Sequence, residues 1–306
     1  MTTDETPEAP ATDETLATSE PPQEQEPQEA PEAVEPGRFQ ADPRRRTATV
    51  RGVELGRGRP EIIVPLVGAD EEELLAQATA AAGTRARIME WRMDRFRPDL
   101  EDEADHREAV LAALPALRGT LGPDRALLVT FRTAAEGGTR PIADRDLALL
   151  LEALLGGRRA GTQTAVDLVD IETSRDPAVV ARVIAAAHRH GTVVVGSYHD
   201  MEGTPSAEEL VEILRGQRRL GADVPKVAVM PRTPRDVLAL LEASLTIAED
   251  LSGPFLAISM GALGASSRVS AEVFGSAATF ASVGAGSAPG QLGAEDVAGM
   301  LELLRP

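Results

Sequence analysis

An alternation of short apolar runs with longer amphipathic stretches is the feature of this sequence that most restricts its fold. The runs are five to seven residues long and consist mainly of β-branched and aliphatic residues. In the stretches between them, apolar residues recur with the period of a helix. Strands that alternate with helices form a parallel sheet, and strands that are apolar throughout are buried on both faces.

Eight runs predict eight strands, at residues 62–67, 86–91, 126–131, 166–171, 192–198, 224–230, 255–259 and 279–283. The stretches between and after them predict helices at 70–82, 105–118, 144–155, 177–190, 206–220, 234–249 and 294–304. Helix boundary signals agree, because residues 204–209 supply an N-cap with acids behind it, and Gly191 and Gly221 follow helix ends.

Eight strand–helix units in about 250 residues are typical of a (β/α)8 barrel, the TIM barrel. An open, doubly wound sheet is the alternative. The first strand–helix turn, residues 67–70, lacks the glycine-rich loop with which that fold binds phosphate, so we favour the barrel.

The N-terminal part of the chain has a different composition. Residues 1–45 are mainly Glu, Pro, Thr, Ala and Gln, which bury too little apolar surface to offset the entropy of ordering. We therefore predict a disordered acidic tail at 1–45 and a barrel domain at 46–306. A strand at 47–54 followed by a Gly-Arg-Gly turn at 56–58 predicts a short hairpin ahead of the barrel.

Composition excludes several classes of function. The chain has no cysteine, which rules out disulfides, thiolate catalysis and metal sites built on cysteine. Its net charge is −18, and residues 1–37 account for 11 of those charges because they hold 11 acidic residues and no basic one. This charge argues against partners that are nucleic acids or anionic membranes. The sequence has no apolar run of membrane-spanning length and no secretory signal pattern, so we expect a cytoplasmic protein.

Polar residues at the ends of the predicted strands are the candidates for chemistry, because TIM barrels place their active sites there. Glu90, Arg92 and Asp94 share one side of the second strand, either as a structural ion-pair cluster or as substrate contacts. Arg132 directly follows the third apolar run, and Glu136 follows it before two glycines.

The fourth and fifth strands carry further candidates. Asp170 and Glu172 share a face of the fourth strand, whereas Asp167 lies on the other side and is expected to be a solvated strand start. His199 ends the fifth strand. A lone histidine there is more often structural than catalytic, but Glu172 on the neighbouring strand could fix its tautomer. His106, His188 and His190 are expected on helix surfaces.

Lys226 is the only lysine among the 31 basic residues, and it lies in the sixth predicted strand. Alternation places it on one face with Ala228 and Met230. It could extend its amine to solvent. Alternatively its amine could be needed chemically, because arginine, which supplies all the other cations, cannot attack a carbonyl group. Near the C-terminus, Arg268 and Gln291 lie in glycine-rich segments and suit a carboxylate.

Together these segments resemble type I 3-dehydroquinate dehydratase of the shikimate pathway, from about Arg46 to Leu304. The matching motifs, in order, are Glu90-Trp91-Arg92-Met93-Asp94, Thr130-Phe131-Arg132-Thr133 with Glu136-Gly137-Gly138, Asp170-Ile171-Glu172, Ser197-Tyr198-His199-Asp200 with Thr204-Pro205, Lys226-Val227-Ala228-Val229-Met230-Pro231, Ser259-Met260-Gly261, Ser267-Arg268, Phe274-Gly275-Ser276-Ala277 and Ser287-Ala288-Pro289-Gly290-Gln291.

The resemblance implies a TIM barrel, usually a homodimer, that needs no metal or organic cofactor and acts on the small molecule 3-dehydroquinate. It implies that Lys226 forms an imine with the substrate, that His199 acts as base and then as acid, and that Glu172 orients His199. The remaining implied roles are carboxylate binding by Arg268, Gln291 and Ser287, contacts to ring hydroxyls or pocket organisation by Glu90, Arg92 and Arg132, packing on the ring by Met260, and support by Asp94, Glu136 and Asp170.

Two residues depart from the family pattern, and two other functions stay open. Pro65 stands where some members carry a serine, and Ser266 stands where an apolar residue is common. Another Schiff-base lyase, such as a barrel aldolase, would share the imine but usually has a phosphate site near the last two strands. A non-catalytic protein that recruits basic partners through its acidic tail is the other alternative.

Overall fold

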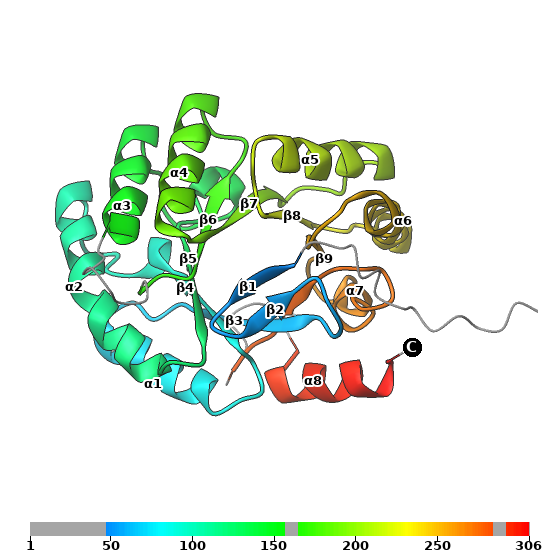
Figure 1. Cartoon of the computed structure of the whole chain (residues 1–306), viewed down its shortest axis with the longest axis horizontal. Helices are drawn as coiled ribbons and strands as arrows, with labels where there is room; N and C mark the ends of the chain where they lie inside the picture. The colour runs from blue at the N-terminus through cyan, green and yellow to red at the C-terminus, as the bar shows by residue number, and fades with distance from the viewer. Residues whose placement is uncertain (1–46, 157–164, 284–291, 306) are drawn as a thin grey trace, which may run out of the picture. The chain divides into compact units, whose positions relative to one another are not determined.

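The computed structural model describes residues 47–156, 165–283 and 292–305, all of which belong to one unit of the chain, Arg38–Pro306. Its centre is an eight-stranded parallel sheet in the order β10-β3-β4-β5-β6-β7-β8-β9 (Figure 1). The strands are β3 (Glu61–Leu66), β4 (Ile88–Arg92), β5 (Ala126–Thr130), β6 (Leu168–Glu172), β7 (Val193–Asp200), β8 (Val224–Val229), β9 (Leu256–Ser259) and β10 (Ala278–Phe280). Just before β9 and β10, Ala277 N donates to Phe255 O at 2.8 Å, which nearly closes the sheet into a barrel.

Helices connect successive strands and surround the sheet (Figure 1). They are α1 (Glu71–Ala82), α2 (Glu103–Leu121), α3 (Asp144–Gly156), α4 (Pro177–His190), α5 (Ala207–Arg219), α6 (Pro234–Asp250), α7 (Ala265–Val269) and α8 (Ala294–Leu303). All eight strands and seven helices expected from the sequence are therefore confirmed, with boundaries that differ by a few residues. Ser206 caps α5 in a capping box with Glu209. Short 3-10 helices η1 (Met93–Arg95) and η2 (Ala134–Glu136) follow β4 and β5.

The N-terminal hairpin exists, but its turn lies earlier than the sequence suggested. Strands β1 (Ala48–Val50) and β2 (Val53–Leu55) pair antiparallel. Arg51 and Gly52 form the turn with φ of 46° and 74°, the backbone that a two-residue type I′ hairpin requires. The expected strand at 47–54 is interrupted at Arg51, where the sequence carries no turn signal because arginine rarely adopts this conformation. The chain does turn at 56–58 as expected, with φ of 92° at Gly56 and 71° at Gly58, but this turn joins β2 to β3 and not β1 to β2.

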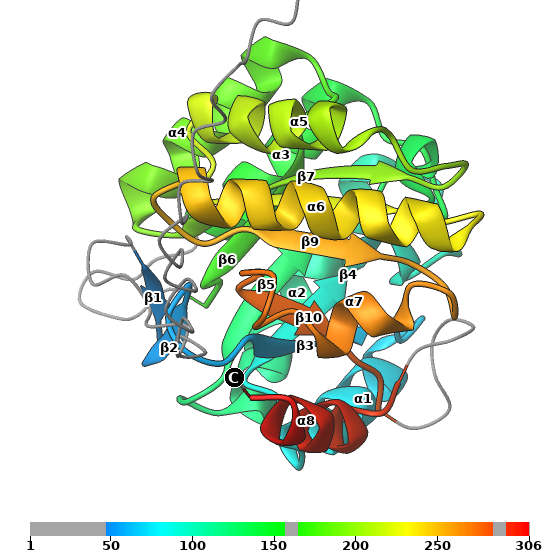
Figure 2. The same cartoon turned by 90° about the vertical axis from the view of Figure 1, so that its right-hand side faces the viewer.

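The hairpin covers the end of the barrel at which β7 and β9 begin (Figure 2). Val53 and Leu55 are buried against side chains of the barrel interior, including Ile63, Ile88 and Leu168. The catalytic end of a TIM barrel is the opposite one, so the hairpin stabilises the fold and leaves the carboxyl ends of the strands open.

Two residues expected at the surface are buried. Asp167 is 7% exposed and accepts hydrogen bonds from Arg51 Nε (2.7 Å), Arg118 Nη1 (3.1 Å) and Leu127 N (2.9 Å). It lies beneath the hairpin, which the alternation of the strand could not reveal. His106 is 1% exposed, and its Nε2 lies 3.1 Å from the carbonyl oxygens of Met93 and Phe96. It therefore supports the segment after β4 instead of facing solvent.

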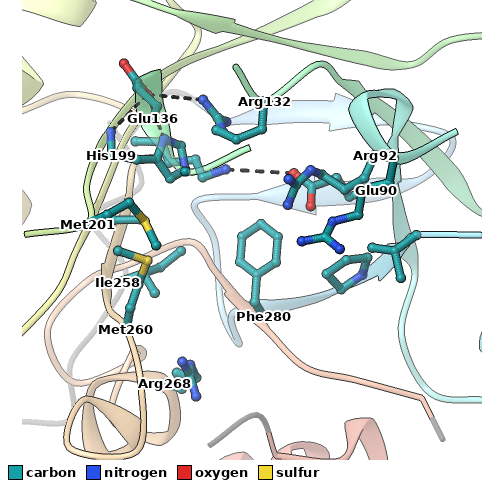
Figure 3. Close-up of a pocket in the computed structure, with 16 residues that line it drawn as sticks. Glu90, Arg92, Arg132, Glu136, His199, Met201, Ile258, Met260, Arg268 and Phe280 are labelled. Carbon is teal, nitrogen blue, oxygen red and sulfur yellow. Dashed lines mark hydrogen bonds and ion pairs between the residues drawn. The ribbon is translucent and has the colours of Figure 1, made fainter. Parts of the chain in front are cut away.

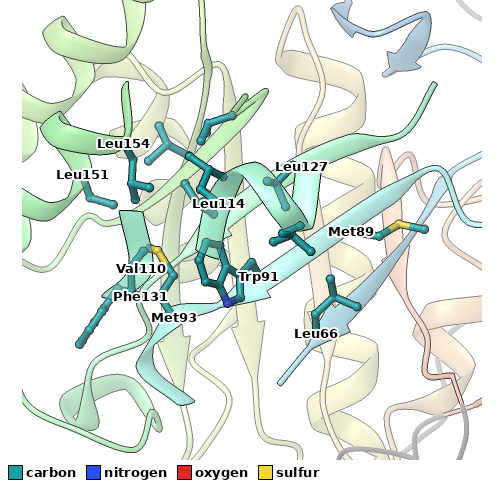
Figure 4. Packing of buried hydrophobic residues seen from close by; sticks show 14 of the residues in the cluster. Leu66, Met89, Trp91, Met93, Val110, Leu114, Leu127, Phe131, Leu151 and Leu154 are labelled. Atoms are coloured by element: carbon teal, nitrogen blue, oxygen red, sulfur yellow. The ribbon is translucent and has the colours of Figure 1, made fainter. Parts of the chain in front are cut away.

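The main hydrophobic core fills the layer between the barrel and its helices (Figure 4). Trp91 of β4 is fully buried there and meets Phe96 edge-on, with ring centroids 5.4 Å apart. Leu114 of α2 and Leu151 of α3 belong to the same core. This packing fixes β4 and β5, whose last residues lead into the site described below. Of the helices in residues 47–156, 165–283 and 292–305, none is long and apolar enough to cross a membrane.

Candidate active site

A cavity of about 250 Å³ lies at the carboxyl ends of the strands and gathers most of the residues that the sequence singled out (Figure 3). Glu90 and Arg92 lie on one side of it, Met201, Ile258 and Met260 on the other, and Phe280 stands between them. The residues that line the cavity include Pro65, Glu90, Arg92, Arg132, Glu136, Gly137, His199, Met201, Lys226, Ala228, Ile258, Met260, Arg268 and Phe280.

Lys226 is buried inside the barrel, only 3% exposed. Its Nζ lies 3.4 Å from Asp170 Oδ2, 3.9 Å from Glu90 Oε1 and 4.9 Å from the centroid of the Phe280 ring. The expected face of β8 is confirmed for Lys226 and Ala228, which both line the cavity. An extension of the amine to solvent is thereby excluded. The surroundings suit a positive charge on the Lys226 nitrogen, because two carboxylates and an aromatic face lie close to it.

The main chain of Lys226 is held by one side chain. Gln217 of α5 accepts from Lys226 N at 2.8 Å through Oε1 and donates to Lys226 O at 3.0 Å through Nε2. Gln217 is 1% exposed, so this amide pair is shielded from water. The start of the lysine side chain is therefore fixed to the helix outside the barrel.

His199 is paired with Glu136, not with Glu172. Its Nδ1 lies 2.9 Å from Glu136 Oε2, and its main-chain N donates to the same oxygen at 3.1 Å. The carboxylate of Glu172 instead accepts from Thr133 N at 2.8 Å and Thr133 Oγ1 at 2.7 Å. The expectation that Glu172 orients His199 is wrong in this structure, because η2, in the loop after β5, brings the Glu136 carboxylate within hydrogen-bond distance of His199.

Two glycines make that loop possible. Gly137 adopts φ of +84°, the left-handed region that favours glycine. At Gly138 an added Cβ would lie 1.8 Å from the carbonyl oxygen of Arg132, so any side chain would displace the backbone. The chain can therefore turn back over Arg132 and present the Glu136 side chain to His199.

Arg132 lies at the centre of a buried cluster of acids. Its Nη1 donates to Glu172 Oε1 at 2.9 Å and Glu136 Oε2 at 3.2 Å, and its Nη2 donates to Asp170 Oδ1 at 2.9 Å. Burial disfavours the charged guanidinium, but Asp170 and the two glutamates hold the pKa of Arg132 above its ordinary value. Arg132 thus serves to organise the acids.

The same cluster shifts the pKa of its acids in opposite directions. Burial raises the pKa of Glu136 to about 7, with Arg132 opposing that shift and Glu172 adding to it. The pKa of Asp170 is lowered, because Arg132 and Lys226 together outweigh its burial. Glu136 is therefore the acid of this cluster that can change its charge near neutral pH.

The environment of His199 favours the neutral imidazole. Burial, followed by the nearby charges of Arg132 and Lys226, lowers its pKa well below the ordinary value. Since Nδ1 faces a carboxylate, it carries the proton when Glu136 is ionised, and Nε2 then has the lone pair. In this state His199 can act as a base through Nε2, and the contact of Nδ1 with Glu136 fixes the orientation of the ring.

Arg92 and Asp94 form a bidentate ion pair, with both N–O distances at 2.8 Å. The carboxylate of Asp94 also accepts from the main chain of Arg132 and Thr139, both at 3.3 Å. Burial raises and Arg92 lowers the pKa of Asp94, and the net shift is downward. Asp94 therefore supports Arg92, and Glu90 and Arg92 line the cavity.

Arg268 lines the cavity from α7, a short helix that is not among the helices predicted from the sequence. Ser267 holds α7 on β9, since its Oγ accepts from Ser259 N at 3.1 Å and donates to Gly264 O at 2.8 Å. Burial lowers the pKa of Arg268, whose ordinary value is so high that the guanidinium keeps its charge. Ser287 and Gln291, the other two residues expected to bind a carboxylate, lie outside the described residues.

Three residues of the site were missed in the sequence. Phe280 ends the last strand and Met201 follows β7, and both are ordinary core residues by composition. Ser174, two residues beyond β6, donates a hydrogen bond to Glu136 Oε1 at 2.5 Å. Alternation along the last strand could have indicated Phe280, but the contacts of Met201 and Ser174 depend on loop paths.

Comparison with known proteins gives one consistent result. Residues 62–306 match the model of a family described as type I 3-dehydroquinase. A 3-dehydroquinate dehydratase of Bacillus licheniformis is 43% identical over 256 residues, which cover 83% of this chain and 96% of the relative. A 3-dehydroquinate dehydratase of Salmonella agona is 40% identical over 261 residues, covering 85% and 98%.

Solved structures agree with these sequences. A type I 3-dehydroquinate dehydratase from Clostridium difficile, solved with covalent modified comenic acid, has a TM-score of 0.79 at 34% identity and covers 85% of this chain and 98% of its own. The 3-dehydroquinate dehydratase of Geobacillus kaustophilus has a TM-score of 0.77 at 35% identity, with coverage of 85% and 96%.

Proposed function

The chain belongs to the type I 3-dehydroquinase family, whose members are hydro-lyases, and we propose that it removes water from 3-dehydroquinate through an imine on Lys226. The observation that carries this proposal is one cavity that holds a buried amine and an imidazole whose Nδ1 lies 2.9 Å from a carboxylate oxygen. The product is 3-dehydroshikimate.

The reaction begins at Lys226. Its neutral amine attacks the ketone carbon, a C–N bond forms, and the ketone oxygen leaves as water after it takes up protons. The iminium nitrogen is positive, and Asp170 and Glu90 lie beside the position of that charge. They therefore stabilise the intermediate that withdraws electrons from the neighbouring carbon.

His199 performs the elimination. Nε2 takes a proton from the carbon next to the iminium, and the C–H electrons form an enamine. The same Nε2 proton then passes to the departing hydroxyl, the C–O bond breaks, and water leaves as the conjugated iminium forms again. Hydrolysis of that iminium consumes one water and restores the amine, so the net change is the loss of one water from the substrate.

The charge of Glu136 decides whether this base exists. An ionised Glu136 accepts from Nδ1, which leaves the lone pair on Nε2. When the pair takes up one more proton, either the imidazole becomes charged or Glu136 becomes the donor to Nδ1, and Nε2 then carries a proton in both cases. The directions of the two pKa shifts support protonation of Glu136 and not of the imidazole.

The other lining residues hold the substrate in the proposed reaction. Arg268 pairs with its carboxylate, assisted by Ser287 and Gln291, because a guanidinium matches a carboxylate with two parallel hydrogen bonds. Glu90 and Arg92 face the ring hydroxyls, and Met260 packs on the ring. These roles are supported for Glu90, Arg92, Met260 and Arg268 because all four line the cavity.

Borohydride reduction in the presence of 3-dehydroquinate tests the imine. Because Lys226 is the only lysine in the chain, a reduced adduct on a side-chain amine can form at one residue alone. We expect mass spectrometry to find the adduct on the peptide that contains Lys226, together with ultraviolet absorbance from the conjugated enone product. Lys226→Ala is the control and should give neither signal. Turnover by wild type without an adduct would overturn the imine.

We also propose that the enzyme is a cytoplasmic homodimer, as the family resemblance implies. Light scattering on the full chain should give twice the mass of one chain, and a monomer at working concentrations would contradict the dimer. Cell fractionation tests the location, and activity confined to a non-cytoplasmic fraction would contradict it.

A further inference from the structure

A second cavity lies behind the base. It has a volume of about 650 Å³ and is lined by residues of the loops that follow β5, β6 and β7. Glu136, Gly137, His199 and Met201 line both this cavity and the substrate cavity. His199 and Glu136 therefore separate the two cavities. The side of this pair that faces the second cavity is contacted by residues that do not line the substrate cavity.

Ser174 is the residue that contacts Glu136 from the rear side. It lies two positions beyond the end of β6, lines the second cavity and is exposed. Its Oγ donates to Glu136 Oε1 at 2.5 Å, whereas His199 and Arg132 contact Glu136 Oε2. The two carboxylate oxygens thus have separate partners, one toward the base and one toward the second cavity.

We propose that Ser174 is a positioning residue for the base: its hydroxyl keeps Glu136 ionised and turned so that Oε2 accepts the Nδ1 proton of His199. A hydroxyl that donates to a carboxylate stabilises the ionised form. It also fixes the rotation of the carboxylate, since Oε1 cannot turn toward His199 without breaking the bond. The inference rests on the proposed function, in which His199 is the base.

The charges that face Glu136 show why this one hydroxyl matters. Burial raises the pKa of Glu136 most, and Glu172 and Asp170 raise it further, whereas Arg132 and Ser174 lower it. Without Ser174, Glu136 Oε1 would lose this donor, and only the contacts of Oε2 with Arg132 and His199 would oppose burial and two carboxylates. The groups around the pair, by element, are Glu90 and Arg92 on β4, Arg132 after β5, Asp170 and Glu172 on β6, Tyr198, His199 and Asp200 on β7, Lys226 on β8, and Ser174, Arg175 and Glu202 on the second cavity.

The pH dependence of kcat/KM for the full chain with 3-dehydroquinate tests the inference, because kcat/KM reports the pKa of groups in the free enzyme. In Ser174→Ala we expect the acid limb to move up by about one pH unit, as loss of one hydrogen bond to a carboxylate implies. Activity should fall about tenfold at pH 6 and stay unchanged at pH 9. Ser174→Thr keeps the hydroxyl and should restore the wild-type profile.

Thr246→Ala is a matched control, because Thr246 is an exposed residue of α6 whose hydroxyl donates only a local bond to Glu242 O in the described contacts. It should leave the profile unchanged. A Ser174→Ala profile that coincides with wild type, or a loss that is equal at all pH values, would overturn the inference. So would a Ser174→Thr variant that behaves like alanine.

Failure of this inference is distinct from failure of the proposed function. If wild type forms no borohydride adduct on Lys226, the proposed function and this inference both fail. If wild type forms the adduct and Ser174→Ala keeps the wild-type pH profile, only the inference fails. At pH 5, where folded Glu136 is protonated with or without Ser174, thermal unfolding of Ser174→Ala should match wild type, and a lowered melting temperature there with an unchanged kcat/KM profile would show a structural role alone.

Discussion

Glu136 combines a catalytic benefit with a penalty to the folded state. Its folded pKa of about 7 exceeds the ordinary 4.5, so ionisation opposes folding. The penalty is absent below pH 4.5, grows between 4.5 and 7, and is complete above 7. At pH 8 it amounts to about 3 kcal/mol. In the proposed mechanism, the residue that keeps His199 in its working tautomer is thus one whose ionisation destabilises the fold.

Glu136→Gln should separate these two effects. The amide removes the ionisation penalty, so denaturant unfolding at pH 8 should show a gain of up to about 3 kcal/mol, and the gain should shrink toward pH 5. Because an amide cannot stabilise the charged imidazole, kcat should fall about 100-fold or more. The borohydride adduct should still form, since Lys226 is untouched. Wild-type kcat in this variant would show that Glu136 has no part in the base.

Glu172→Gln should behave in the opposite way. Glu172 is 1% exposed and neutralises Arg132, so loss of its charge leaves a buried cation with fewer partners and should cost about 3 kcal/mol in urea unfolding. Its carboxylate also raises the pKa of Glu136, and without it the acid limb of kcat/KM should move to lower pH. If the acid limb of kcat/KM moved to higher pH instead, that result would support Glu172 as the acid that orients His199.

The sequence singled out His199, Glu136 and Glu172, but it did not show which of the two acids forms the hydrogen bond to His199. Composition and strand alternation singled out Lys226, and the end of a predicted strand singled out His199, but their roles as amine and base came from the family resemblance. The register between β6 and β7 pairs Glu172 with Ser197, two residues before His199, so Glu172 lies about 7 Å too low in the barrel. Register and loop path depend on tertiary packing, and neither has a local signal.

At the scale of elements, what could be predicted followed from length and period. The helix Pro177–His190 was found at its exact bounds because it has a proline at its start, an apolar stripe and a glycine after its end. The helix Ala265–Val269 was missed, since five residues make little more than one turn and cannot show a stripe. That helix carries Arg268, so the position of the proposed carboxylate-binding group could not be predicted from local sequence.

Residues at the two ends of β6 have separate roles, which a substitution at Asp167 can test. Asp167, directly before β6, binds Arg51 of the hairpin and Arg118 of α2. Asp167→Asn removes the carboxylate that Arg51 and Arg118 share, and the unfolding free energy should fall by about 3 kcal/mol in urea titration. Because Glu172 lies about 16 Å farther along the strand, kcat and KM of the folded enzyme should stay within about twofold of wild type. A selective loss of kcat would contradict this separation of the two ends.

At the scale of the whole molecule, charge is distributed unevenly along the sequence. Residues 1–37 carry 11 of the 49 acidic residues and no basic one. The proposed substrate is an anion that must reach a cavity with Arg92, Arg268 and Lys226 on its lining. Negative charge elsewhere on the chain can only slow that approach, and salt weakens the effect because the screening length is about 8 Å at 0.15 M ionic strength.

Deletion of residues 1–37 should therefore leave kcat unchanged and change KM only at low salt. Below about 0.02 M ionic strength, where the screening length exceeds about 20 Å, we expect KM to fall by up to about twofold, and at 0.15 M the two proteins should be indistinguishable. A full-length control with glutamine or asparagine in place of the 11 acidic residues keeps the length and removes the charge, so it should follow the deletion. A fall in kcat on deletion would instead make the segment part of the catalytic machinery. A basic partner captured by the full chain and lost by both variants would support recruitment by the acidic segment.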